Sequence, residues 1–234
     1  MTKRYLAVIP ARGGSKGIPK KNIVLVNQKP LIQYTIESAL PLLKRNQLSE
    51  LILSTDSKEI ARVGYQLGLS VPFLRPPALA DDHANMADCL LHALDFFEQR
   101  NSFFDAIVLL QPTSPLRRSL DIEEALRLYE QGNTDSLISI YKEECINDRI
   151  MYDYEAGWAI PFNSDHNKGL RRQESRSIYI RNGAIYIVST DYLKRTHTLF
   201  SDRPLAYVMP KHASLNIDTP DDLTLLAGML CCES

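Results

Sequence analysis

A short segment rich in glycine and cationic side chains lies between residues 10 and 22, directly after the apolar run from Tyr5 to Pro10. Its glycines are Gly13, Gly14 and Gly17, and its cations are Arg12, Lys16, Lys20 and Lys21. Glycines let the backbone curl so that several N–H groups converge on one anion. Neither the Walker pattern nor the dinucleotide G-x-G-x-x-G pattern is present. The segment therefore predicts a phosphate-binding loop, and the alternative is a solvated basic turn.

Gln111 is a second candidate, because it follows Ala106 to Leu110, the strongest strand signal in the chain. Ligands bind at the carboxyl ends of strands in open α/β sheets, and an amide there can hydrogen-bond a polar substrate. The turn-forming residues 112 to 115 allow an equal alternative, in which Gln111 only ends the strand.

The strands and helices that must position these residues are expected to alternate along the chain. Apolar runs predict strands, and helical spacing of apolar residues predicts helices. The expected strands are 5–10, 51–55, 71–74, 106–110, 136–140 and 184–188. The expected helices are 31–44, 58–67, 86–98, 121–129 and 222–230, with Asp56 and the 218–221 segment as N-terminal caps. This rhythm predicts an α/β fold, a Rossmann-like three-layer sandwich with a mainly parallel sheet, in one domain over 1–234.

Residues 141 to 177 interrupt the rhythm, because they are polar and have few periodic apolar positions. Such a stretch inside a domain is a functional loop or an arm that packs on a partner. It carries Arg149, Arg171, Arg172 and Arg176. A guanidinium is a natural receptor for a carboxylate, whereas a charged surface arm is the alternative.

Bulk composition excludes several classes of protein. The 234 residues are 44% hydrophobic and 24% charged, with a formal net charge of −1, so we expect no nucleic-acid partner. The first apolar run is too short for a signal peptide, and no run of roughly 20 apolar residues could span a membrane. The four cysteines match no zinc spacing, which is typical of free thiols in a reducing cytoplasm.

The loop, read as Ile9-Pro-Ala-Arg-Gly-Gly-Ser-Lys-Gly-Ile-Pro-Lys-Lys-Asn-Ile23, closely resembles the opening motif of the CMP-sialic acid synthetases. This family also includes enzymes for legionaminic and pseudaminic acids. Six further blocks follow in the family's order and span nearly the whole chain. They are Leu53-Ser-Thr-Asp56, Leu74-Arg-Pro76, Leu110-Gln-Pro-Thr-Ser-Pro-Leu-Arg117, Arg172-Gln173, Asn182-Gly-Ala-Ile-Tyr186 and Ile217-Asp-Thr-Pro220.

The resemblance implies that CTP and a nine-carbon acidic sugar give the CMP-sugar and pyrophosphate in a cytoplasmic, Mg²⁺-dependent homodimer. It implies catalytic roles for Arg12, Lys21 and Asp218, with Asp218 also the metal ligand. The implied nucleotide-binding residues are Arg12, Gly13, Gly14, Ser15, Lys16, Lys21, Asn22 and Arg75. The implied sugar-binding residues are Gln111, Arg172, Asn182, Tyr186 and Asn216, and the 141–177 arm would reach across the dimer.

One position departs from the family. Asn216 stands where relatives usually carry a second aspartate, two residues before Asp218. Asn216 is neutral, which removes one candidate general base and favours a metal-activated hydroxyl. Asp218 could also serve as a helix cap. The alternatives to the main hypothesis are a CTP-binding homologue with little turnover and an enzyme for the related eight-carbon acid.

Overall fold

The computed structural model describes residues 3–15, 17–81, 84–144, 148–168 and 177–232. Its centre is a six-stranded sheet in the order β4-β1-β5-β9-β6-β10. The strands are β1 (Tyr5–Pro10), β4 (Glu50–Ser54), β5 (Ala106–Leu109), β6 (Ser136–Glu143), β9 (Ile178–Ser189) and β10 (Leu205–Met209). Only β9 is antiparallel to its neighbours in this sheet. The prediction of a mainly parallel sheet is therefore confirmed.

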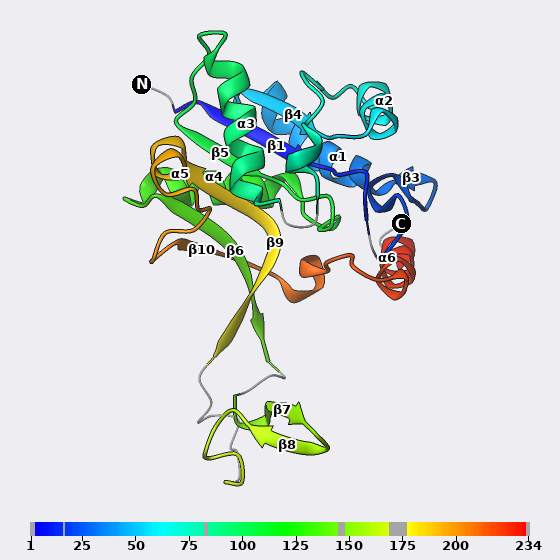
Figure 1. The fold of residues 1–234 in the computed structure, drawn as a ribbon, viewed down its shortest axis with the longest axis vertical. Helices are drawn as coiled ribbons and strands as arrows, with labels where there is room; N and C mark the ends of the chain where they lie inside the picture. Colours follow the sequence, from blue (N-terminus) through cyan, green and yellow to red (C-terminus); the bar gives the residue numbers. More distant parts are fainter. Residues whose placement is uncertain (1–2, 16, 82–83, 145–147, 169–176, 233–234) are drawn as a thin grey trace.

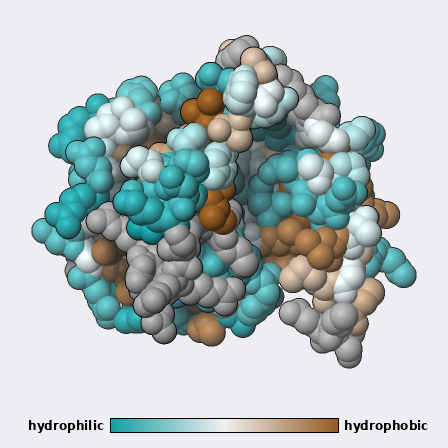
Figure 2. Space-filling view, turned by 90° about the horizontal axis from the view of Figure 1, so that it is seen from below, coloured by the Kyte–Doolittle hydropathy of each residue, from teal (hydrophilic) through white to brown (hydrophobic). Residues whose placement is uncertain are grey.

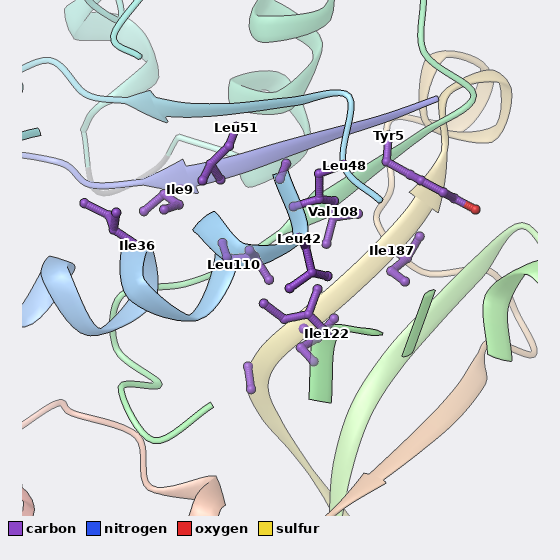
Figure 3. Packing of buried hydrophobic residues seen from close by; sticks show 14 of the residues in the cluster. Tyr5, Ile9, Ile36, Leu42, Leu48, Leu51, Val108, Leu110, Ile122 and Ile187 are labelled. Atoms are coloured by element: carbon purple, nitrogen blue, oxygen red, sulfur yellow. The ribbon is translucent and has the colours of Figure 1, made fainter. Parts of the chain in front are cut away.

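Helices cover both faces of the sheet and make three layers (Figure 1). They are α1 (Leu31–Lys44), α2 (Lys58–Gln66), α3 (Met86–Glu98), α4 (Ser119–Gln131), α5 (Thr190–Thr196) and α6 (Pro220–Cys232). Alternate residues of β1 enter different cores: Tyr5 and Ile9 pack with α1, α2 and α4, while Leu6 and Val8 pack with α3 and α5. Figure 3 shows the first of these cores. Burial on both faces explains why β1 reads as a continuous apolar run.

Two expected local features are wrong, and two further elements were not expected. In the described structure the segment 71–74 makes no strand, and its backbone pairs with the 52–55 segment only through isolated bridges at Ser70 and Leu74. Pro72 lacks the N–H that a ladder would need. The cap of α2 is Ser57, whose hydroxyl accepts from the Ile60 N–H, and not Asp56. The strand β10 and the helix α5 are present in addition to the expected elements.

The expected irregular segment 141–177 is partly ordered. β6 and β9 continue beyond the sheet as a two-stranded stalk that includes the pair Lys142 and Tyr179. Beyond it lies a hairpin of β7 (Tyr152–Glu155) and β8 (Trp158–Pro161), which projects away from the sheet (Figure 1). Short elements η1 (Lys21–Ile23), β2 (Leu25–Val26), β3 (Lys29–Pro30), η2 (Pro77–Leu79), η3 (Asp148–Ile150) and η5 (Lys211–Ser214) complete the structure.

Seen from the hairpin end, the surface is mostly hydrophilic and its hydrophobic residues form separate patches (Figure 2). None of the helices in the described part of the chain combines the length and hydropathy needed to cross a membrane.

Candidate active site

Two clefts meet at Gln111, at the carboxyl end of β5. We name the first the loop cleft; it has a volume of about 340 Å³ and is bordered by the 10–22 loop and by Asp218. We name the second the sheet cleft; it has a volume of about 650 Å³ and lies against the stalk, η5 and α6. Gln111 lines both clefts. A ligand in the loop cleft can therefore meet a ligand in the sheet cleft next to the Gln111 side chain.

The loop is held by its own side chains and by β4. The N–H of Gly13 donates to Asp56 Oδ1 at 2.8 Å, and Asn22 Nδ2 donates to the Arg12 carbonyl at 3.0 Å. Asp56 therefore pins the loop, a role that the sequence did not reveal because Asp56 fits the pattern of a helix cap. Arg12, Ser15 and Asn22 line the loop cleft. Lys20 instead pairs with Glu59 of α2 at 2.8 Å.

Lys21 connects the loop to the far end of the sequence. Its Nζ donates to the Ile217 carbonyl at 2.8 Å and to Asp218 Oδ1 at 3.1 Å. The two backbones approach closely here, because a Cβ on Gly17 would lie 2.7 Å from the Asp218 carbonyl oxygen. The side chain of Lys21 is 17% exposed and that of Asp218 is 65% exposed, so the pair lies at the mouth of the loop cleft.

Asp218 is not the cap of α6. Thr219 and Asp222 form a capping box, in which the Thr219 N–H donates to Asp222 Oδ2 at 2.7 Å and the Asp222 N–H donates to Thr219 Oγ1 at 3.4 Å. Burial would raise the pKa of Asp222, but hydrogen bonds from the Asp218 and Thr219 N–H groups outweigh it and lower that pKa. The Asp218 carboxylate therefore takes no part in capping α6 and lies at the loop cleft.

The same carboxylate accepts a hydrogen bond from Asn216 Nδ2. Within the described residues, no group of three or more His, Cys, Asp or Glu side chains is arranged to hold a metal. Magnesium needs only one or two carboxylates when phosphate oxygens and water complete its coordination. A single exposed carboxylate at the cleft mouth therefore fits a metal that arrives with a phosphate ligand.

Arg75 lies at the inner end of the loop cleft. Its backbone N–H donates to the Thr55 carbonyl at 2.7 Å, and the residue is 4% exposed. Its Nη1 contacts Cys89 Sγ at 3.2 Å, whereas Nε and Nη2 have no hydrogen-bond partner in the described structure. A buried guanidinium without acceptors is costly, which indicates that a ligand supplies them.

The buried side chain of Arg117 holds the backbone of Gln111 in position. The guanidinium of Arg117 donates from Nη1 to the Ala184 carbonyl at 2.6 Å and to the Gln111 carbonyl at 3.4 Å. Burial lowers the pKa of Arg117, and Asp121 opposes that shift. Gly183 faces the side-chain amide: its φ is +75°, and a Cβ there would lie 2.8 Å from Gln111 Oε1. The close approach and the left-handed backbone both require glycine.

Asn182 and Tyr186 are both predicted sugar-binding residues that line the sheet cleft, but they differ in their hydrogen bonds. Asn182 is buried, and its amide is already bonded to Ser139, Ser214 and the Ala184 N–H. It therefore holds the backbone that carries Gly183. Tyr186 also lines the cleft, and burial raises the pKa of its hydroxyl while Arg181 opposes the shift. Its ring packs edge-on against Phe200.

The remaining predicted residues divide into two groups. Lys16, Arg171, Arg172 and Arg176 lie outside the described residues. Gly14 has open space where a Cβ would lie, and Arg149 is in η3, 4.0 Å from Asp165. The structure thus brings together Arg12, Ser15, Lys21, Asn22, Arg75, Gln111 and Asp218 around one cleft, and Gln111, Asn182, Tyr186 and Asn216 around the other.

Comparisons with known proteins show the family to which this chain belongs. Residues 6–220 match the family model described as cytidylyltransferase. The chain is 36% identical to the N-acylneuraminate cytidylyltransferase of Streptococcus agalactiae, over 96% of this chain and 53% of that protein. It is 34% identical to the CMP-N,N'-diacetyllegionaminic acid synthase of Legionella pneumophila, over 97% of this chain and 96% of that protein.

The fold is also similar to a solved structure of CMP:2-keto-3-deoxy-manno-octonic acid synthetase complexed with CTP. That comparison has a TM-score of 0.69 and 18% identity, and it covers 99% of this chain and 100% of the other. The chain spans about half the length of the streptococcal relative. A family match over most of the chain and a near full-length relative lead to one conclusion: this chain belongs to the cytidylyltransferase family.

Proposed function

We propose that this chain transfers the cytidylyl group of CTP to a nine-carbon acidic sugar of the sialic, legionaminic or pseudaminic acid type and releases pyrophosphate. The observation that carries the proposal is the position of Gln111, which lines both the loop cleft and the sheet cleft. A nucleotide in the first and a sugar in the second would meet beside it. Membership of the cytidylyltransferase family supports the choice of CTP.

The triphosphate would occupy the loop cleft. Arg12 and Lys21 offer cations, and the backbone N–H groups around Gly13, Gly14 and Ser15 offer donors. Lys16, on the same loop, is proposed to add charge, and Asn22 to contact the nucleotide. When the α-phosphorus bond to the leaving group breaks, negative charge develops on the pyrophosphate, and Arg12 with Lys21 would stabilise it.

The base would be read by Arg75. Nε–H and one Nη2–H lie along the same edge of a guanidinium and form a two-donor fork. Both of these nitrogens lack partners in the described structure, while Nη1 is engaged by Cys89. Cytosine presents two adjacent acceptors, N3 and O2, which match such a fork. Uracil carries a hydrogen on N3, so it would leave one donor facing another.

The sugar would occupy the sheet cleft, with its anomeric hydroxyl toward Gln111. That oxygen loses its proton to solvent water and attacks the α-phosphorus; the new O–P bond forms as the bond from the α-phosphorus to the bridging oxygen breaks and pyrophosphate departs. The amide of Gln111 and the hydroxyl of Tyr186 are proposed to bind the sugar's polar groups, with Asn216 beside the reacting oxygen. Asn182 would contribute by shaping the cleft wall. Arg172 is proposed to bind the sugar carboxylate.

Mg²⁺ is proposed as the cofactor, and Asp218 as the protein ligand. When bound, the cation would neutralise phosphate charge and lower the pKa of the attacking hydroxyl. Asn216 cannot accept that proton as a base, and its Nδ2 bond to Asp218 instead orients the carboxylate. Lys21 holds the second oxygen of the same carboxylate, so ligand binding and the position of Lys21 are coupled.

A homodimer is part of the proposal. The hairpin exposes large apolar side chains, among them Tyr154 at 77% and Trp158 at 74% exposure. Exposed apolar side chains gathered on a projecting arm are typical of a protein interface. The arm would cover the sheet cleft of a second copy and bring Arg172 to it. A cytoplasmic location is supported by Cys89 and Cys231, neither of which forms a disulfide.

The decisive experiment is pyrophosphate release from CTP and Mg²⁺ with sialic, legionaminic and pseudaminic acids in parallel. We expect release that depends on one of these acids and on CTP. Absence of release with all three, from protein that is folded and dimeric, would refute the proposal. The eight-carbon acid serves as the comparison substrate and is expected to be poor, because the 32–36% identical relatives are not enzymes named for it.

Mixing two inactive variants tests the dimer. If each site combines the loop of one chain with the arm of its partner, a heterodimer of Lys21→Ala and Arg172→Ala has one intact site. Random reassortment then gives about one quarter of the wild-type activity. No recovery after mixing would show that Arg172 acts in its own chain.

A further inference from the structure

Cys89 contacts the guanidinium that is proposed to read the base. The residue is 2% exposed and lies on α3, one turn after the N-cap Asn85. Its thiol donates to the Leu79 carbonyl at 3.1 Å and accepts from Arg75 Nη1 at 3.2 Å. A thiol is both a weak donor and a weak acceptor, and this one uses both capacities.

The contact occupies one side of the Arg75 guanidinium, and the buried nitrogens Nε and Nη2 on the other side have no hydrogen-bond partner among the described residues. Within the described residues, no carboxylate pairs with Arg75, so its orientation depends on its buried surroundings and on the sulfur. Because the guanidinium is planar, holding Nη1 on one edge directs Nε and Nη2 along the opposite edge. Arg75 lines the loop cleft, and Nε and Nη2 are its buried donors without a partner, so they are the donors that remain for a ligand there.

Cys89 also connects this guanidinium to the chain segment that begins with η2. Leu79 ends η2, and two residues later the Asp81 carbonyl accepts from Arg12 Nη1 at 3.2 Å. The thiol thus joins α3, η2 and Arg75, and the continuing backbone reaches a phosphate-binding arginine. A change at Cys89 therefore reaches the ligand through Arg75 and through the η2 backbone.

We propose that Cys89 is a positioning residue that aims the Arg75 fork and thereby sets the preference for CTP over UTP. This inference rests on the proposed function, in which Arg75 reads cytosine. Cys89 itself does not contact the nucleotide. Its effect is on selectivity because a fork that is no longer held can turn one donor away, which harms a two-acceptor base more than a base with a single matching acceptor.

The test compares Cys89→Ala with Cys89→Ser, which differ from each other by one hydroxyl group. Dissociation constants for CTP and for UTP, each with Mg²⁺ and without sugar, are measured by calorimetry on the full chain. We expect Cys89→Ala to weaken CTP binding by about tenfold while UTP binding changes by less than about twofold, as for loss of a hydrogen bond to a charged group. Cys89→Ser, which keeps a donor and an acceptor, is expected to recover most of the loss.

Cys231→Ala is the matched control, because Cys231 is an exposed cysteine on α6 that does not line either cleft. Its CTP and UTP constants should equal those of the wild type. Thermal unfolding of every variant shows whether a change is due to lost folding. In the kinetic assay, Cys89→Ala should raise KM for CTP with little change in kcat, and KM for the sugar should stay constant.

The outcomes separate this inference from the proposed function. If the wild type binds CTP and UTP equally, the base-reading role of Arg75 is wrong. If the wild type prefers CTP and Cys89→Ala keeps the same CTP-to-UTP ratio, the function stands and the role of Cys89 is overturned. Equal weakening of both nucleotides, or no rescue by serine, would likewise assign Cys89 to packing alone.

Discussion

Lys21 Nζ lies 3.1 Å from Asp218 Oδ1, which joins two residues 197 positions apart in the sequence. The ammonium also donates a hydrogen bond to the Ile217 carbonyl at 2.8 Å, which fixes its orientation. A cation from the phosphate loop and the proposed metal-binding carboxylate are therefore held as one unit before any ligand arrives. The positive charge of Lys21 and the negative charge of Asp218 offset each other.

Replacing Lys21 should remove charge stabilisation and also release Asp218. We expect Lys21→Ala to lower kcat by about 100-fold or more, as for loss of a charged contact to a transition state. The kcat of the variant and of the wild type is measured from steady-state pyrophosphate release. Lys29→Ala is the control, because Lys29 pairs with Glu37 of α1 at 2.9 Å on the surface. Wild-type rates in Lys21→Ala would contradict the assignment.

Helices and buried strands were predictable because their patterns are local. The expected ranges of α1 and α3 agree with the structure, since each has a long apolar face. α5 has only seven residues, too few to display a helical period, although Ser189 caps it by accepting from the Tyr192 N–H. The hairpin turn at Ala156 and Gly157 uses positive φ at both residues, a conformation that alanine rarely adopts.

The cleft was predictable only in part. Lys21, Gln111 and Asp218 belong to motifs with a chemical meaning, and the structure brings them together. Arg117 and Cys89 have buried side chains that support other residues, and such roles depend on contacts between segments that are distant in sequence. Sequence patterns report which face of an element is buried, but they do not report which neighbour it meets.

Restoring an acid at position 216 should strengthen metal binding. Asn216→Asp replaces the Nδ2 donor to Asp218 by a second carboxylate, which favours a divalent cation between them. We expect the Mg²⁺ concentration for half-maximal activity to fall by about threefold to tenfold. A magnesium titration at saturating CTP and sugar measures this. An unchanged requirement would show that position 216 does not face the metal, and activity that appears only in the variant would identify the natural chain as a CTP-binding homologue.

Adding a methyl group at Gly183 should displace Gln111. Its φ of +75° strains any other residue, and the new Cβ would lie 2.8 Å from Gln111 Oε1. We expect Gly183→Ala to lose about 1–3 kcal/mol of unfolding free energy and to raise KM for the sugar. Gly68→Ala is the matched control, because Gly68 has φ +79° but open space around its Cβ position. The two variants should share the stability loss, and only Gly183→Ala should change sugar KM; equal sugar KM values in both would contradict the contact.

The hydroxyl of Tyr186 should remain a donor well into the alkaline range. Burial raises its pKa above the ordinary value of 10, so the protonated form persists at pH values where an exposed tyrosine ionises. We expect Tyr186→Phe to raise KM for the sugar by about tenfold, and by the same factor at pH 7.5 and at pH 9.5, since the wild-type hydroxyl is protonated at both. Tyr65→Phe on α2 is the control and should leave KM unchanged at either pH. If the effect of Tyr186→Phe faded as the pH rose, the hydroxyl would be ionising within that window, and its proposed role as a buried hydrogen-bond donor to the sugar would be wrong.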